Sequence, residues 1–175
     1  MMNKLRSHNL KLIVGVFAFL IIVLGCSVNV TFKGSSVPDN IKIASVQYFE
    51  NRAPYINPAL SQSFTEALKD RITSESRLIV RTGVGDVDFS GEIVGYETRP
   101  MAIQADALSQ ETRLTVTIKV RYNNFKDPRL NWESNFSAYQ DFPSESNITA
   151  IEDELVTLIV DEITQNIFNK AFSDW

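Results

Sequence analysis

The sequence predicts an α+β fold, a two-layer sandwich in which two helices pack on one side of a single mixed β-sheet, in the order βαβββα. Two observations lead to this prediction. Residues 113–122 alternate strictly between apolar and polar side chains, as a half-buried strand does. Residues 57–76 and 149–172 repeat apolar side chains at helical spacing. We expect residues 41–175 to form this domain.

The first half of the domain has the pattern of a strand–helix–strand unit. Residues 41–49 carry apolar side chains on both faces, which indicates an inner strand covered at least partly on each side. Asn57 and Pro58 predict a helix start, because Asn can cap free amides and Pro is tolerated at the first helical position. The helix should end near Ser76. A short strand over residues 78–81 should then run parallel to the first, with a right-handed crossover.

A longer strand is predicted over residues 87–98. Gly91 and Gly95 interrupt it, and glycines inside a strand indicate a bulge or the close approach of another backbone. A long loop over residues 99–110 follows. We expect this strand to be the first of an antiparallel meander of three.

The alternating strand is the second member of the meander. A turn containing Asp127 and Pro128 separates it from a returning strand over residues 130–138, which has a partly apolar face. The alternation assigns one face to Leu114, Val116, Ile118, Val120 and Tyr122, and the other face to Arg113, Thr115, Thr117, Lys119 and Arg121.

The last helix is predicted to start at a capping box. Thr149 precedes Glu152 by three residues, the spacing at which the two side chains cap each other's backbone amides. The apolar stripe behind this start consists of Ile151, Leu155, Leu158, Ile159, Ile163 and Ile167.

The N-terminal segment has the three parts of a secretory signal. Basic residues lead into an uncharged, almost wholly apolar run over residues 12–24, which is shorter than the roughly 20 residues that a spanning helix needs. The exit, Gly25-Cys26, resembles a bacterial lipobox, although Val23 and Leu24 depart from its commonest form. We therefore expect a signal peptide over residues 1–25, lipidation of Cys26, and a linker up to residue 40. An ordinary secretory signal or a short anchor with an incidental cysteine is the alternative.

Lipidation would anchor the mature chain to a membrane. Two or more acyl chains on Cys26, as the lipobox implies, anchor a protein stably. Residues 27–30 contain no acidic residue, so the aspartate signal for inner-membrane retention and the acidic signal for surface export are both missing from this stretch. We expect the protein on the periplasmic side of the outer membrane.

The charge of the mature chain disfavours nucleic acid as a partner. Without Lys4, Arg6 and Lys11, the 17 basic residues fall to 14 against 21 acidic ones, a net charge of −7. The charges are unevenly spread, since residues 133–175 hold nine acids against Lys170 alone. Such segregation indicates either a functional surface or merely two solvated faces. The basic segment holds Arg113, Lys119, Arg121, Lys126 and Arg129 against Asp127.

The mature chain lacks the side chains of common catalytic and metal sites. The only histidine of the sequence, His8, lies in the predicted signal peptide, so the mature chain has none. A lipidated Cys26 has no free thiol. We therefore expect no Ser-His or Cys-His nucleophile and no usual zinc site. Asp86 and Asp88 at a strand start are better explained as solvated residues than as metal ligands. We therefore predict no catalytic residues, no metal and no cofactor.

Several segments together resemble the LptE family of lipopolysaccharide-assembly lipoproteins, in the form found in Bacteroidetes-type bacteria. They are the lipobox, residues 90–96 (SGEIVGY), the alternating residues 113–120 (RLTVTIKV) and residues 167–172 (IFNKAF). The resemblance implies a two-layer α/β domain that sits as a plug in the outer-membrane β-barrel LptD and helps lipopolysaccharide reach the cell surface. Some members of the family bind lipopolysaccharide through basic residues near loop tips, and none of those positions is carried over to this chain. The candidates here are the basic residues of the segment 113–129, because Arg and Lys pair well with the phosphates of lipid A.

Two other functions remain open from the sequence. Residues 41–51 loosely resemble the start of periplasmic lipoproteins that form homo-oligomeric secretion rings. A carboxylate-dependent hydrolase needs only paired acids, which the chain has in number, but no pair stands in an obvious aromatic cleft. A bound β-barrel, a homo-oligomer or a bound sugar would distinguish the three hypotheses.

Overall fold

The structure is a computed structural model, and it describes residues 37–55, 57–101 and 110–172. The signal segment, Cys26 and most of the predicted linker lie outside the described residues, as does most of the predicted loop over residues 99–110. The described residues belong to one compact unit.

The described domain contains one mixed sheet. β1 and β3 are parallel, β1 and β4 are also parallel, and β4, β5 and β6 form an antiparallel meander. The order across the sheet is β3-β1-β4-β5-β6, with β2 also paired to β4. The predicted parallel unit and the predicted meander are both confirmed. The strands are β1 (Ile43–Val46), β2 (Glu50–Asn51), β3 (Ile79–Arg81), β4 (Val87–Pro100), β5 (Glu111–Asn124) and β6 (Trp132–Pro143).

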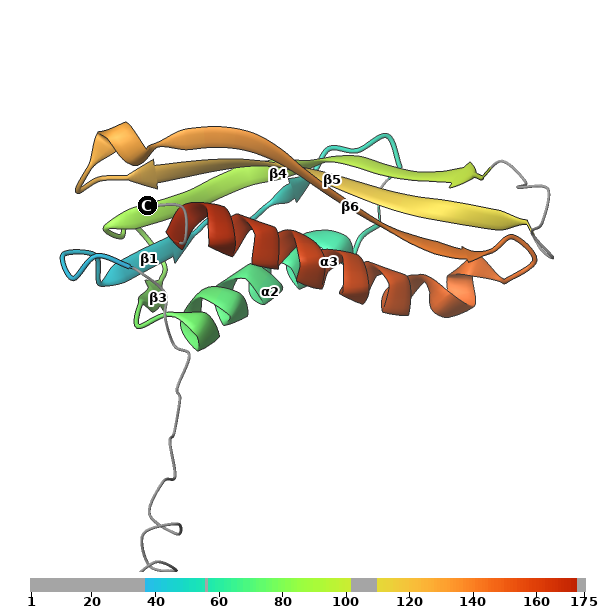
Figure 1. The fold of residues 1–175 in the computed structure, drawn as a ribbon, viewed down its shortest axis with the longest axis horizontal. Helices are drawn as coiled ribbons and strands as arrows, with labels where there is room; N and C mark the ends of the chain where they lie inside the picture. The colour runs from blue at the N-terminus through green and yellow to red at the C-terminus, as the bar shows by residue number, and fades with distance from the viewer. Residues whose placement is uncertain (1–36, 56, 102–109, 173–175) are drawn as a thin grey trace, which may run out of the picture. The chain divides into compact units, whose positions relative to one another are not determined.

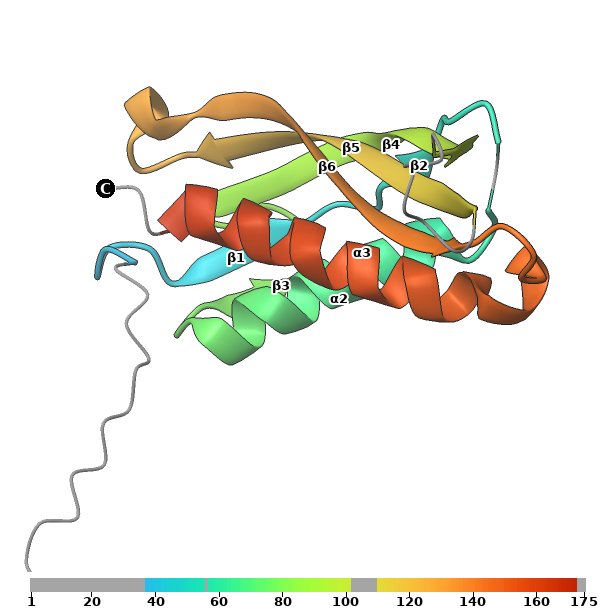
Figure 2. The ribbon, with the colours of Figure 1, turned by 45° about the vertical axis from the view of Figure 1, so that its right-hand side comes forward.

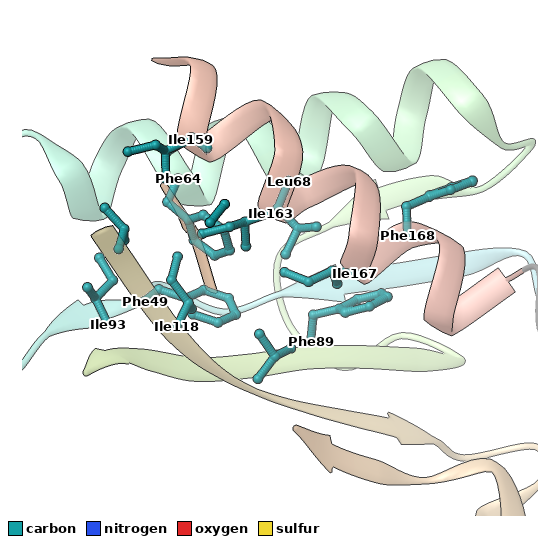
Figure 3. Packing of buried hydrophobic residues seen from close by; sticks show 14 of the residues in the cluster. Phe49, Phe64, Leu68, Phe89, Ile93, Ile118, Ile159, Ile163, Ile167 and Phe168 are labelled. Carbon is teal, nitrogen blue, oxygen red and sulfur yellow. The ribbon is translucent and has the colours of Figure 1, made fainter. Parts of the chain in front are cut away.

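Two helices, α2 (Leu60–Glu75) and α3 (Ile148–Phe172), pack side by side on one face of this sheet, as predicted (Figures 1 and 2). The core fills the space between the two layers. Figure 3 shows Phe64 and Leu68 of α2 meeting Ile163 of α3 above the sheet. All three side chains are fully buried.

The alternation along β5 decides which face of the sheet the helices cover. Its apolar row is buried against them, while Lys119 and Arg121 lie on the opposite face and remain accessible. A slip of one residue would exchange the two rows, so burial fixes the register. The buried row is the predicted one: Leu114, Val116, Ile118, Val120 and Tyr122.

Several predicted elements have different bounds, and β4, for example, continues to Pro100. The strand predicted over residues 41–49 is confined to β1, and the short β2 follows it outside that range; both pair with β4. The returning strand, predicted to end at residue 138, continues to Pro143 because β5 offers it partners as far as Glu111. Asn57 caps α2 as expected, since its side-chain oxygen accepts the N–H groups of Ala59 and Leu60 at 2.9 and 3.2 Å.

The predicted capping box at Thr149 is wrong. Asn147 caps α3, because its side-chain oxygen accepts the Thr149 N–H at 3.1 Å. Glu152 is therefore available for tertiary contacts. It accepts hydrogen bonds from the Tyr96 hydroxyl and, at 3.0 Å, from the Asn57 amide.

The two glycines of β4 have the expected roles. At Gly91, where φ is +157°, an added Cβ would lie 2.0 Å from the Lys119 carbonyl oxygen, so β5 can approach only because no side chain is present. The register between β4 and β5 shifts between Ile93 and Gly95, which marks the bulge.

Asp86 joins three parts of the domain that are distant in sequence. One carboxylate oxygen accepts the backbone N–H groups of Lys42 and Ile43 at 2.9 and 3.0 Å, and the other lies 2.9 Å from Lys126 Nζ. The hydrogen bond from Lys42, followed by that from Lys126, lowers the pKa of Asp86 to about 2.

We predict that Asp86→Asn destabilises the domain by about 1.5–3 kcal/mol near neutral pH, because it removes the charge from three hydrogen bonds. A carboxyl pKa that is lower in the folded state stabilises above the unfolded pKa of about 4, and this contribution is lost as pH falls through the folded value. The difference between wild type and variant should therefore shrink towards pH 2 in urea unfolding. Asp39→Asn is the control, since the Asp39 side chain is 95% exposed. A difference that stays constant with pH would contradict the ionic role of Asp86.

Candidate functional site

The face of the sheet opposite the helices is not covered by any part of the chain that the structure describes (Figure 1). Polar side chains from β5 and β6 lie side by side along it. The Thr117 and Ser137 hydroxyls, for example, are 3.1 Å apart across the two strands. We call this surface the outer face, and it carries three of the five predicted basic residues.

Lys119 and Arg121 form the centre of the basic row. They lie two residues apart on β5, and both contact Glu133 of β6. Lys119 Nζ is 2.8 Å from one Glu133 oxygen, and Arg121 approaches the other at 2.7 Å. Hydrogen bonds from Lys119 and then Arg121 hold the pKa of Glu133 below its ordinary value. The carboxylate therefore stays ionised at neutral pH and remains shared by the two cations.

A shallow hollow of about 260 Å³ opens beside this triad. Gly91 allows β4 to approach β5 there, and Glu92 lines the same hollow. Glu92 also contacts Arg52 at 3.2 Å. The hollow therefore brings cations and carboxylates together, and an anion that binds in it would compete with Glu133 for Lys119 and Arg121.

Arg113 lies near the start of β5, at the opposite end of the strand. It makes two hydrogen bonds to Asp141 of β6, at 2.7 and 2.8 Å, and its guanidinium lies 3.5 Å from the centre of the Tyr139 ring. The hydrogen bond from Arg113 lowers the pKa of Asp141. A stacked, doubly bonded arginine has little freedom to contact a ligand.

Lys126 and Arg129 lie in the turn between β5 and β6. Buried Asn124 shapes this turn, because its side-chain oxygen accepts the N–H groups of Lys126 and Asp127, each at 2.9 Å. Lys126 contacts Asp86. Arg129 pairs with Asp127 at 2.8 Å, and its side chain is 88% exposed.

The structure thus brings Lys119 and Arg121 together, places Lys126 and Arg129 in one turn, and separates Arg113 from both groups. Each of the five cations contacts a carboxylate. The sequence analysis did not anticipate these partners, because the register between β5 and β6 supplies two of the four. The only sequence signal was the presence of acids on the returning strand. The carboxylate partners are Glu133, Asp141, Asp86 and Asp127.

A second polar cluster, also missed by the sequence analysis, lies between β4 and the start of α3. Tyr96 is buried and donates to Glu152, while the exposed ring of Tyr55 stacks on Tyr96 at 5.3 Å. Burial raises the pKa of Tyr96, and the hydrogen bond to Glu152 raises it further. The phenol therefore stays protonated, and its hydrogen bond to Glu152 fixes the start of α3 to β4.

Among the described residues, no group of three or more His, Cys, Asp or Glu side chains could hold a metal ion. In the same part of the chain, no helix is long and apolar enough to cross a membrane.

Solved structures with the same fold come from several bacteria. A minor lipoprotein of Acinetobacter baumannii is 14% identical, with a TM-score of 0.50 over 75% of this chain and 92% of its own. A hypothetical protein of Chlamydia trachomatis is 12% identical, with a TM-score of 0.55 over 77% and 99%. A protein of Xanthomonas campestris is 13% identical, with a TM-score of 0.52 over 79% and 86%. Likenesses at these identities establish the fold alone.

No curated protein sequence matches the chain significantly. The family model LptE, described as lipopolysaccharide-assembly, matches residues 41–171, which is nearly the whole predicted domain. The predicted resemblance is confirmed, and the chain belongs to the LptE family of lipopolysaccharide-assembly proteins.

Proposed function

We propose that this protein is a lipid-anchored, non-enzymatic component of the outer-membrane lipopolysaccharide transport machinery, seated as a plug in an LptD-type β-barrel. Membership of the family supports a role in lipopolysaccharide assembly, and the outer face is the observation that supports a location inside the barrel. The lumen of a large outer-membrane barrel is polar, so an element inside it needs an exterior of hydroxyls and balanced charges. The outer face provides both, since hydroxyls alternate there with ion pairs.

The basic residues supply the contact with lipopolysaccharide in this proposal. Arg and Lys bind phosphate through charge-assisted hydrogen bonds, so the phosphates of lipid A are suitable ligands. Lys119 and Arg121 share one carboxylate and therefore have one positive charge in excess of it. Arg129 is the most exposed of the five and lies in a turn. We propose that the Lys119–Arg121 pair makes the main contact with phosphate and that Lys126 and Arg129 make additional contacts. Arg113 contributes least, because it is bound to Asp141.

The anchor completes the proposal. Residues 1–25 act as the signal peptide and lipidated Cys26 holds the mature chain on the periplasmic side of the outer membrane. Acyl chains in place of a spanning helix leave the domain free to enter a barrel from the periplasm.

We predict that an outer-membrane β-barrel co-purifies with the native protein when membranes are solubilised in mild detergent. The two chains should elute together in size-exclusion chromatography at equal stoichiometry and be identified by mass spectrometry. A homo-oligomer without a barrel would contradict this proposal and favour the secretion-ring alternative.

Cys26→Ala should release the protein from the membrane without unfolding it, because the cysteine carries the anchor and lies outside the domain. Fractionation should place the variant in the soluble periplasmic fraction, while the neighbouring change Ser27→Ala leaves the protein bound to membrane. A Cys26→Ala protein that stays in the membrane fraction would indicate an uncleaved apolar anchor.

We predict that Lys119→Gln combined with Arg121→Gln weakens binding to purified lipopolysaccharide by about tenfold, since two charge-assisted contacts are lost. Glu133→Gln should act in the opposite direction and strengthen binding by about two- to fivefold. The variant removes the carboxylate that competes with phosphate for Lys119 and Arg121, and a surface ion pair of this kind contributes up to about 1 kcal/mol. Binding can be measured by fluorescence titration at constant ionic strength.

A further variant, Arg113→Gln, serves as the control, because it removes the same type of charge from the distant end of β5. If the double variant and Glu133→Gln both bind like wild type, the phosphate contact does not lie at this triad.

A further inference from the structure

The two edges of the sheet are built very differently. β3 forms one edge with three residues, whereas β6 forms the other with twelve. Beyond β6, no strand is paired with it in the part of the chain that the structure describes. β6 lies at the open side of the sheet along α3 (Figure 2). An edge of this length presents a row of unpaired backbone groups.

The register identifies these backbone groups. The Ser144 N–H donates to the Gln110 carbonyl at 2.9 Å, so this pair is hydrogen-bonded across the two chains. Hydrogen-bonded and non-bonded pairs alternate in an antiparallel ladder, and the β5–β6 register continues without a shift. Even-numbered residues of β6 therefore bond to β5. The odd-numbered residues direct their N–H and C=O groups away from the sheet, and they are Glu133, Asn135, Ser137, Tyr139 and Asp141.

β6 lacks the features that normally protect an edge from pairing with another strand. Its sequence contains no lysine, its only proline is the last residue, Pro143, and its pairing with β5 has no bulge. Natural edges are commonly protected by lysine, proline, a bulge or shortness. β3 is protected by shortness, whereas β6 has only Pro143 at its end and the carboxylates of Glu133 and Asp141, which are paired with cations of β5.

Apolar side chains lie along the same edge on the side of the helices. Trp132 and Phe136 of β6 pack against each other at 5.7 Å, but both remain partly accessible although they face the core. Leu158 of α3, the helix that packs against β6, is 48% exposed. An added strand would cover apolar surface on this side while it satisfies the backbone groups of β6.

The acidic side chains near the β6 edge indicate which kind of strand would bind there. Glu133 and Asp141 stand on β6 itself, and α3 exposes Glu154 and Glu162 one turn on either side of Leu158. A second copy of the chain would bring two such acidic surfaces together. A basic segment of another protein would be attracted instead.

We propose that β6 is a docking edge for an extended segment of a partner protein, which adds a strand to the sheet with apolar side chains towards α3 and basic residues among its polar ones. The docked segment accepts hydrogen bonds from the N–H groups of the odd-numbered residues of β6 and donates to the carbonyls of the same residues. This inference does not depend on the barrel partnership, because any protein with such a segment fits the edge.

Hydrogen exchange of the full-length protein tests the proposal directly. The probe is the peptide acetyl-Lys-Val-Thr-Val-Lys-Val-Thr-Val-Lys-amide, added in excess. We expect exchange at the odd-numbered amides of β6 to slow about tenfold or more, while the even-numbered amides, already bonded to β5, change little. The matched control peptide has the same side chains but carries an N-methyl group on every backbone amide, so neither of its edges can donate to β6 and it should give no protection.

Two variants at one position separate the backbone from the side chain. Asn135 lies in the middle of β6, and its N–H points away from β5. Asn135→Pro removes that donor and should weaken peptide binding by about tenfold, whereas Asn135→Ala keeps it and should bind within about twofold of wild type. Circular dichroism checks that both variants fold, and if Asn135→Pro does not, the N-methylated peptide still provides the test in the wild-type protein.

The proposal is overturned if the N-methylated peptide protects as well as the parent, or if no odd-numbered amide slows. It is also overturned if the odd-numbered amides of the protein alone become protected as its concentration rises, because the edge would then pair with a second copy. Barrel co-purification with no peptide pairing would leave the proposed function intact and remove only this inference.

Discussion

The alternation along β5 is the constraint on which the rest of this structure depends. It buries one row of side chains against two helices, so the opposite row must remain at the surface of the sheet. β5 also fixes the positions of its neighbours. Gly91 allows β4 to approach the backbone of Lys119, and β6 follows β5 in register over its whole length. The alternation in β5, with its period of two residues, therefore determines which face of the sheet the helices cover and which face stays open.

The open face is basic in sequence but nearly balanced in structure. Carboxylates of β6 stand opposite the cations of β5, and exposed pairs of this kind contribute little to stability. Their main effect is to reduce the long-range field of the basic row, so that the face is polar without being strongly charged. In the proposed function, such a surface would meet the polar wall of the barrel, and a phosphate would replace a carboxylate there at modest cost.

The fold was largely predictable because its strongest signals are local. Alternation in β5, helical spacing in α2 and the two glycines of β4 each act through neighbours a few residues away, and each was interpreted correctly. The errors arose at one helix cap and where a distant contact decides. Thr149 lost the cap of α3 to Asn147, and Glu152 instead binds Tyr96 and Asn57, which no local pattern indicates. The carboxylate partners of the basic row were missed for the same reason, since only the strand register places Glu133 beside Lys119 and Arg121.

The outer face and the β6 edge are connected through Glu133 and Asp141. Both acids stand on β6, both neutralise cations of β5, and their backbone groups belong to the free edge. A basic strand that docks along β6 would bring its cations within reach of the same carboxylates. Each carboxylate that turns to the new strand would leave Lys119, Arg121 or Arg113 with positive charge to offer elsewhere. The basic residues of the docked strand and the cations of β5 would compete for the same carboxylates. Strand docking at the edge and anion binding on the outer face would therefore strengthen each other.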